Sequence, residues 1–349
     1  MKNKKFLIDE GKSIIDAIKI LNNTTNVSRL ILFVINKSKI IIGSLTDGDI
    51  RRSIAVDMDL NKNVEEICNR NFIFKYETNS YLELKSIYKK NIKILPILNE
   101  DKTLSRIIDL ENTKALLPLE CIIMAGGRGK RLSPITDKIP KPMLCINGKP
   151  IIEYNIDRIV SYGIKKIYIS VGYLSKQIKD YFGDGSDKGI EIKYIHENKP
   201  LGTIGALSII KKDIKSDYLL VMNSDLFTNV DFEEIFNKIY NSKSDMVVAS
   251  KDYTVDIPYG VFETKNNTIL DLKEKPSYTY YSNAGIYILN KKIISLIPKN
   301  TYFDITDLMD QLVVDNKNII HCPIRGYWID IGGPEDYNKA KDFSKYLNQ

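Results

Sequence analysis

A glycine-rich loop with basic side chains is the clearest place in this sequence where chemistry could occur. The loop reads AGGRGKRLSPIT from Ala125 and directly follows a short apolar run. Gly126, Gly127 and Gly129 carry no side chain and would let backbone amides approach a phosphate closely. The alternative is an ordinary glycine turn whose basic side chains are solvated.

Neither of two well-known phosphate-binding patterns matches this loop. The third glycine of GxGxxG would stand at Leu132, and Arg131 replaces the Ser or Thr of a P-loop. Downstream, Pro140 and Pro142 flank Lys141 and stiffen the backbone around it. A lysine held in this way can act as a fixed charge for a phosphate, although alone it is more typical of an exposed loop.

A carboxylate, Asp225, follows the apolar run Tyr218–Met222 in the sequence NSD. A carboxylate at the C-terminal end of a strand is well placed for a hard cation such as Mg²⁺. Aspartate is also common in turns, so this residue alone does not identify a metal site.

The elements that would position these residues alternate between strands and helices from Glu120 onward. This series predicts a mostly parallel sheet with ligands at the C-terminal ends of its strands. The strands are predicted at Cys121–Ala125, Lys166–Val171, Ile190–Ile195 and Tyr218–Met222, and the helices at Ile151–Tyr162, Ser175–Phe182 and Thr203–Lys211.

The first 118 residues follow a different pattern, in which one motif of about 50 residues occurs twice. Each copy combines a helical segment with two extended runs around a polar turn, and Ala115–Leu119 is a plausible joint to the second domain. The first copy continues into GSLTDGD and a helix from Ile50, whereas the second copy is degenerate.

Composition disfavours several functional classes. The chain of 349 residues carries 51 basic and 44 acidic side chains and four cysteines without a CxxC pair. A nucleic-acid binder, a zinc site and a disulfide framework are therefore disfavoured. No apolar stretch approaches the length of a membrane span or a signal peptide, so the expected location is the cytoplasm, with no membrane or nucleic-acid partner.

The loop and the PKPM segment together resemble the nucleotidyltransferases that join sugar 1-phosphates to nucleoside triphosphates. The family patterns are GGxGxRLxPxT, followed by KPxL or KPxM, and this chain reads GGRGKRLSPIT and then PKPM. The resemblance extends from about Cys121 to Tyr337. It implies a Rossmann-like, mostly parallel α/β sheet domain and the release of pyrophosphate when an anionic sugar phosphate attacks the α-phosphate.

The resemblance also assigns roles to individual residues. Catalytic roles fall to Arg131, Lys141, Asp225 and Asp330, and the two aspartates would hold Mg²⁺. The nucleotide-binding residues would be Ala125, Gly126, Gly127, Gly129, Lys130, Glu197, Leu201, Gly202 and Thr203, the last three in a base-recognition loop. The sugar-phosphate side would consist of Tyr259, Gly260, Glu274, Lys275 and Asn283.

The GSLTDGD segment resembles CBS domains, which pair as regulatory modules and often bind adenine nucleotides. Thr46 and Asp49 would then contact a nucleotide effector, or the pair would only build the interface of a homo-oligomer. The sequence thus predicts a small α+β CBS-pair domain at residues 1–118 and a catalytic domain at 119–349.

The combination of both domains resembles guanylyltransferases that act on glucosamine 1-phosphate in legionaminic acid synthesis. GTP and glucosamine 1-phosphate are therefore the expected substrates, with other bases, or mannose, heptose or glucose 1-phosphate, as alternatives. A glycosyltransferase would show DxD instead of NSD. A nucleotide-sensing protein with an inactive enzyme domain is the rival from another class.

Overall fold

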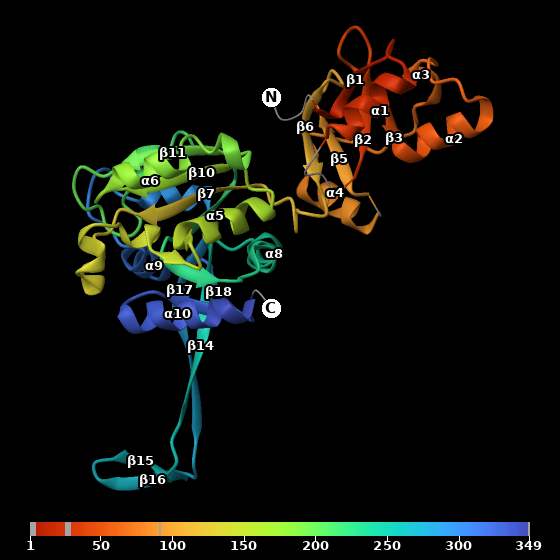
Figure 1. Ribbon diagram of the computed structural model, residues 1–349. Helices are drawn as coiled ribbons and strands as arrows, with labels where there is room; N and C mark the ends of the chain where they lie inside the picture. The colour runs from red at the N-terminus through yellow and green to blue at the C-terminus, as the bar shows by residue number, and fades with distance from the viewer. Residues whose placement is uncertain (1–4, 25–28, 91, 348–349) are drawn as a thin grey trace. The chain divides into compact units, whose positions relative to one another are not determined.

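The computed structural model describes residues 5–24, 29–90 and 92–347, which form two compact units divided between Leu116 and Leu117. The predicted domain boundary after residue 118 lies two residues from this division, and the division into 1–118 and 119–349 stays a proposal. Figure 1 shows the chain from the first unit, in red and orange, to the second, in yellow to blue.

The first unit contains two three-stranded sheets with the same strand order and sense. In each sheet the first two strands are parallel and the last two are antiparallel. The first sheet has β1 (Leu7–Asp9), β2 (Ile31–Ile35) and β3 (Ile41–Thr46), and the second has β4 (Lys75–Tyr76), β5 (Ile94–Leu98) and β6 (Leu104–Asp109). The repeated pairing agrees with the internal repeat predicted from the sequence.

Four helices accompany these two sheets, and they differ between the copies. They are α1 (Ile14–Asn22), α2 (Asp47–Asp57), α3 (Val64–Ile67) and α4 (Tyr81–Lys85), the last followed by a short 3-10 helix at Ser86–Lys89. Buried residues of α1, α2 and α3 pack with Leu32, Val34 and Leu45 in the core of the first copy. In the described residues, β6 is not followed by a helix comparable with α2.

The second unit is built on a seven-stranded sheet that confirms the α/β prediction. Its order is β11-β10-β7-β12-β17-β14-β18, and only β17 runs antiparallel to its neighbours. The strands are β7 (Leu119–Ala125), β10 (Lys166–Val171), β11 (Glu191–His196), β12 (Tyr218–Asn223), β14 (Met246–Asp256), β17 (Ser277–Asn290) and β18 (Ile319–Pro323). The four predicted strands are the first four of these, and each parallel strand ends at the same edge.

Helices cover this sheet, and its core is formed by side chains such as Ile122, Leu219 and Leu289, none of which is exposed. The helices are α5 (Ile151–Ser161), α6 (Ser175–Phe182), α7 (Leu207–Ile210), α8 (Phe232–Ser242), α9 (Ile305–Val314) and α10 (Pro334–Leu347). Short strands complete the unit: β8 (Cys145–Ile146), β9 (Lys149–Pro150), β13 (Leu226–Thr228), β15 (Val261–Lys265), β16 (Thr268–Lys273) and β19 (Trp328–Asp330). Five segments are 3-10 turns, at Lys130–Leu132, Ile135–Asp137, Lys141–Met143, Ser186–Lys188 and Lys291–Leu296.

A long two-stranded ribbon leaves the sheet and ends in the β15–β16 hairpin (Figure 1). It consists of the distal halves of β14 and β17, paired continuously from Ser250 opposite Asn283 to Asp256 opposite Ser277. None of residues 251–283 is buried. We call residues 251–283 the arm.

The predicted helix at Thr203–Lys211 is shorter than expected. The structure has turns at residues 202–206 and only α7, Leu207–Ile210, as α-helix. The amides of Ile204 and Gly205 both donate to the carbonyl of Phe303, at 3.2 Å and 3.1 Å. Because these amides are bonded to a distant segment, the local helical tendency gives way to a tertiary contact.

Candidate active site

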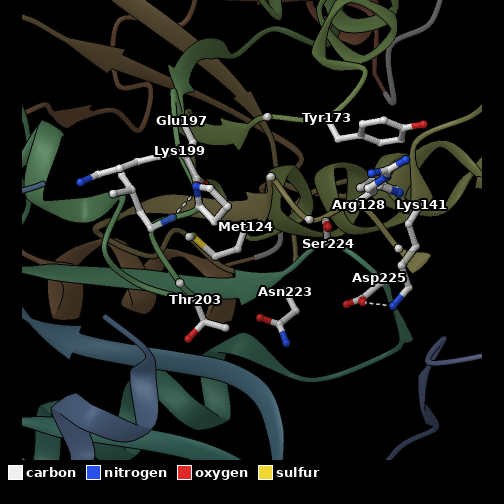
Figure 2. A pocket seen from close by; sticks show the side chains of 18 of the residues that line it. Met124, Arg128, Lys141, Tyr173, Glu197, Lys199, Thr203, Asn223, Ser224 and Asp225 are labelled. Atoms are coloured by element: carbon white, nitrogen blue, oxygen red, sulfur yellow. Dashed lines mark hydrogen bonds and ion pairs between the residues drawn. The ribbon is translucent and has the colours of Figure 1, made fainter. Parts of the chain in front are cut away.

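A cleft of about 580 Å³ lies where β7, β10, β11 and β12 end. Each strand contributes the residues that directly follow it, as the topology of a parallel sheet requires. Its lining includes Gly126–Gly129 after β7, Tyr173 after β10, Glu197–Thr203 after β11 and Asn223–Asp225 around the end of β12. Figure 2 shows these side chains around the cavity.

The glycine loop packs so tightly that side chains would not fit at most of its positions. A Cβ at Gly126 would lie 2.6 Å from Glu197 Oε1, and one at Gly129 would lie 2.9 Å from Lys141 Cβ. Gly129 also has a φ of +65°, a left-handed conformation that favours glycine. Gly127 differs, because nothing lies within 4 Å of its Cβ position. The backbone of Gly127 is therefore open to a ligand in the cleft.

Glu197 lines the cleft, but its carboxylate is bonded to the chain itself. Ser170 Oγ donates to Glu197 Oε1, and the amide of Leu201 donates to Oε2 at 3.1 Å. Glu197 therefore fastens the start of the predicted base-recognition loop to β10. This anchoring role was not foreseen from the sequence, which assigned Glu197 to the ligand.

The predicted base-recognition loop is fixed to the start of α9 by reciprocal hydrogen bonds. The amide of Thr203 donates to Asp304 Oδ1 at 2.8 Å, and the amide of Ile305 donates to Thr203 Oγ1 at 2.7 Å. A Cβ at Gly202, whose φ is +75°, would lie 2.7 Å from Phe303 O. Thr203 therefore caps α9 across the fold, and the loop has one well-defined position beside the cleft.

We predict that Gly205→Ala weakens nucleotide use by displacing this loop. A Cβ at Gly205 would lie 2.2 Å from Leu201 O and 2.7 Å from Thr301 O, which are both backbone atoms and cannot rotate away. The KM for the nucleotide should rise roughly tenfold or more, since a displacement of about 1 Å can cost up to about 10² in rate. Steady-state kinetics measure this effect, and Gly11→Ala is the control because its Cβ position is open. An unchanged KM would show that the loop does not position the nucleotide.

Lys141 and Asp225 line one side of the cleft, and Asp330 lies on the neighbouring strand β19, outside the lining. Lys141 Nζ donates to Asp225 Oδ2, and the two side chains are only 16% and 21% exposed. The register of β13 with β19 places Leu226 opposite Asp330, and the amide of Ile331 donates to Asp225 O at 3.1 Å. Figure 2 shows the dashed contact between Lys141 and Asp225.

The pKa of the Asp330 carboxyl is set by partial desolvation and by the charge of Asp225. Although the residue is accessible to solvent, neighbouring atoms partly desolvate the carboxyl and the charge of Asp225 repels it, so its pKa is raised. Lys141 and Arg131 act in the opposite direction but do not cancel the effect.

This pair of carboxylates fits a divalent cation that takes its other ligands from substrate and water. Two neighbouring hard oxygen donors suit Mg²⁺, which usually keeps waters and binds phosphate oxygens. In residues 5–24, 29–90 and 92–347, there is no group of three or more His, Cys, Asp or Glu side chains that could hold a metal by itself.

Three of the predicted site residues in the glycine segment lie outside the lining of the cleft. Ala125 is buried at the end of β7, whereas Lys130 and Arg131 are exposed in the following 3-10 turn. Arg131 is nevertheless close enough to Asp330 to lower its pKa. The predicted catalytic arginine therefore acts electrostatically on Asp330 although it does not line the cleft.

The predicted sugar-side residues do not join the other residues at the cleft. Tyr259, Gly260, Glu274 and Lys275 lie on the arm, and none of them lines the cavity. Gly260 and Glu274 are close to each other, since a Cβ at Gly260 would lie 3.2 Å from Glu274 Oε2. Asn283 stands at the base of the arm, where its Oδ1 accepts from the amide of Gly285 at 3.0 Å.

The cleft also contains residues that the sequence reasoning did not select. The Arg128 guanidinium lies over the Tyr173 ring, 5.3 Å from its centroid, and Tyr173 Oη donates to Asp137 O at 2.9 Å. Asp304 Oδ2 accepts from Tyr302 Oη at 2.9 Å, and both residues line the cavity. The position of Arg128 among the glycines was a usable signal, whereas nothing near Tyr173 or Tyr302 in the sequence pointed to this site.

In the first unit, Thr46 and Asp49 bond to each other rather than standing open to a ligand. The amide of Asp49 donates to Thr46 Oγ1 at 3.3 Å, and the amide of Thr46 donates to Asp49 Oδ2 at 2.8 Å. This reciprocal arrangement is a capping box at the start of α2. Arg52 donates to Asp49 Oδ1 at 2.6 Å.

We predict that Thr46→Ala destabilises the start of α2 by about 1 kcal/mol, the usual cost of removing a capping side chain. Hydrogen exchange of the α2 amides measures the loss, and Ser38→Ala in an exposed turn is the control. Unchanged exchange together with lost binding of ATP would show that Thr46 serves a ligand instead.

The sole tryptophan of the sequence joins two strands of the second unit. Trp328 Nε1 donates to Ala284 O at 2.8 Å, which ties β19 to β17. Among the residues that the structure describes, no helix is long and apolar enough to cross a membrane.

Comparison with known proteins connects both units to described families. Residues 120–346 match the family model described as nucleotidyl transferase, and residues 1–56 match the CBS domain. The bifunctional protein GlmU of Methanococcus maripaludis is 35% identical over 241 residues, which cover 66% of this chain and 55% of GlmU. The chain therefore spans about half the length of that relative.

Two further proteins match over nearly their whole length. The D-glycero-alpha-D-manno-heptose 1-phosphate guanylyltransferase of Aneurinibacillus thermoaerophilus is 32% identical over 231 residues, covering 66% of this chain and 100% of that enzyme. The crystal structure of HddC from Yersinia pseudotuberculosis complexed with GMP-PN has a TM-score of 0.51 and 30% identity, covering 64% of this chain and 99% of HddC.

Proposed function

The chain belongs to the nucleotidyl transferase family, and we propose that it transfers a nucleotidyl group from GTP to a sugar 1-phosphate with release of pyrophosphate. The observation that carries this proposal is the single cleft that combines the glycine loop, Lys141 and Asp225 with the loop Leu201–Thr203. Phosphate-binding amides, a fixed cation and a carboxylate thus surround one cavity of suitable size.

The reaction needs little acid or base chemistry from the protein. The nucleophile is a sugar phosphate oxygen that is already anionic, so catalysis must come from alignment and charge neutralisation. The glycine loop would orient the triphosphate, Lys141 would face the α-phosphate, and Arg131 would neutralise the departing pyrophosphate. Mg²⁺ bound by Asp225 and Asp330 would supply further neutralisation of the phosphate oxygens.

We propose glucosamine 1-phosphate as the acceptor and legionaminic acid synthesis as the use of the product. The guanine assignment is supported by the guanylyltransferase of Aneurinibacillus thermoaerophilus named above and by another similar protein, a mannose-1-phosphate guanylyltransferase. The acceptor assignment rests on the resemblance of the two-domain sequence. Tyr259, Gly260, Glu274, Lys275 and Asn283 would bind the sugar phosphate. We also propose a cytoplasmic location and a nucleotide effector at the CBS unit.

Measuring pyrophosphate release from a grid of nucleoside triphosphates and sugar 1-phosphates tests the proposal. We expect a signal that requires both substrates and Mg²⁺ and is largest for GTP with glucosamine 1-phosphate. A larger signal with heptose, mannose or glucose 1-phosphate, or with another base, would keep the reaction and correct the specificity. Nucleotide binding without pyrophosphate release in any combination would instead indicate a nucleotide-sensing protein.

A further inference from the structure

The arm is amphipathic, with one apolar face that nothing in its own unit covers. Directly opposed residues in an antiparallel ribbon share a face, and successive residues alternate between faces. Tyr253 therefore shares a face with Tyr280, and Val255 shares it with Tyr278. Tyr253 and Tyr280 are 65% and 60% exposed.

The opposite face of the arm is mostly polar, with Tyr281, opposite Asp252, as its aromatic residue at the base. Thr254 opposes Thr279, their hydroxyls 3.1 Å apart, and Asp256 opposes Ser277. The terminal hairpin repeats this division, since Phe262 opposes Leu272 on one face. On its other face Glu263 opposes Asp271, and Lys273 forms an ion pair with Glu263. An antiparallel ribbon with one apolar and one polar face is typically packed on its apolar face and solvated on its polar face.

The exposed apolar surface of the arm is large enough for a stable contact. Apart from Tyr281 on the other face, its large apolar side chains that are at least one-third exposed are Tyr253, Val255, Tyr259, Phe262, Ile269, Leu270, Leu272 and Tyr280. Together they present on the order of 1,000 Å², since a large aromatic side chain alone can bury about 150–250 Å². A standard protein interface buries about 800 Å² on each partner.

A second copy of this chain would cover the apolar face of the arm and would also supply the sugar-phosphate residues that do not line the cleft. We propose that the arm of each chain docks on the second unit of another copy of this chain and brings Glu274 and Lys275 to that copy's cleft. This inference rests on the proposed function, in which these two residues bind the sugar phosphate.

The continuous pairing of the ribbon favours docking of the arm on a second copy over folding of the arm back onto the cleft of its own chain. Seven successive residues of β14, from Ser250 to Asp256, pair with β17, and the amide of Ile257 extends the ladder to Pro276 O at 3.0 Å. At its base the Tyr281 ring packs against His321 of β18, with centroids 4.6 Å apart. Folding back would break these contacts, whereas docking on another copy leaves them intact.

The receiving surface offers matching apolar groups near the cleft. Tyr302 lines the cleft and is 59% exposed, and Ile135 and Ile139 are 45% and 41% exposed between Gly129 and Lys141. Exposed apolar side chains that surround a polar cavity are typical of an interaction surface.

Light scattering tests the interface without reference to activity. We expect the mass of two chains for the wild type and of one chain for Tyr253→Ser with Tyr280→Ser. The control Thr254→Ser with Thr279→Ser, on the polar face, should remain dimeric. A wild type that is monomeric, or a dimer that survives the two tyrosine substitutions, would overturn the proposed contact.

Complementation tests whether the arm acts on the other copy's cleft. Asp225→Asn and Lys275→Ala chains, each inactive alone, are coexpressed with different tags and purified as mixed dimers. One of the two clefts then combines an intact pocket with an intact arm, so about half of the wild-type activity should return. Activity that stays at the level of the parent variants would show that the arm serves its own chain. An inactive wild type would instead refute the proposed function, and the mass measurement would still decide the interface.

Discussion

Pyrophosphate release by Asp225→Asn is expected to fall by ~10²–10³-fold or more, as is typical when a preorganised electrostatic group is removed. Asp225 interacts with two charged neighbours. It forms an ion pair with Lys141, and its negative charge raises the pKa of Asp330. The substitution removes one of two hard oxygen donors proposed for Mg²⁺ and leaves the Lys141 ammonium without its carboxylate. Steady-state assays at saturating GTP and sugar 1-phosphate measure the loss.

The same variant should retain nucleotide binding, because the glycine loop and the loop Leu201–Thr203 are unchanged. Its dependence on Mg²⁺ should also shift to higher concentrations, since one donor is lost. Asp342→Asn is the matched control, as Asp342 lies in an exposed ion pair with Lys345 on α10. Turnover of Asp225→Asn within a few-fold of the wild type would refute the assignment of Asp225 to the chemistry.

The contiguous parts of the site could be predicted from the sequence because each is encoded locally. The glycine loop follows its strand directly, and Lys141 is fixed between two prolines only twelve residues after Gly129. Asp225 could be placed because it follows a strand whose apolar run is unambiguous. The parallel topology then brings the ends of these strands to one edge, so their meeting at one cleft followed from the strand order.

Contacts between distant segments could not be predicted in the same way. Thr203 and Asp304 are 101 residues apart and the amide of Thr203 donates to Asp304 Oδ1, yet neither residue suggests the other in the sequence. This contact also explains why the predicted helix at Thr203–Lys211 is shortened. A single sequence reports local preference, and here the tertiary hydrogen bonds outweigh it.

The arm shows a second limit of sequence reasoning. Alternating side chains around Tyr253 and Tyr280 predict strands, but alternation does not say where a ribbon leads or what covers its apolar face. The resemblance assigned Glu274 and Lys275 to the sugar phosphate, and the structure places them outside the cleft lining of their own unit. Sequence therefore suggested a role for these residues, while their position depends on contacts beyond the ribbon.

The second large loss of turnover is expected for substitutions of Lys141, because neither methionine nor arginine should perform its function. Lys141→Met should reduce turnover by ~10²–10³-fold, because it removes the fixed charge proposed for the α-phosphate and leaves Asp225 unpaired beside Asp330. Lys141→Arg keeps the charge, so a purely electrostatic requirement would be satisfied by it.

The geometry around Lys141 nevertheless argues that Lys141→Arg stays strongly impaired. The lysine is only 16% exposed, its Cβ lies 2.9 Å from the Cβ position of Gly129, and the flanking prolines prevent the backbone from giving way. A planar guanidinium is larger than an ammonium and would have to displace either the glycine loop or Asp225. Comparing kcat and the KM for GTP in both variants separates the two requirements. If Lys141→Arg restored turnover to within a few-fold of the wild type, charge alone would be sufficient and the close packing of Lys141 against the loop would have no catalytic importance.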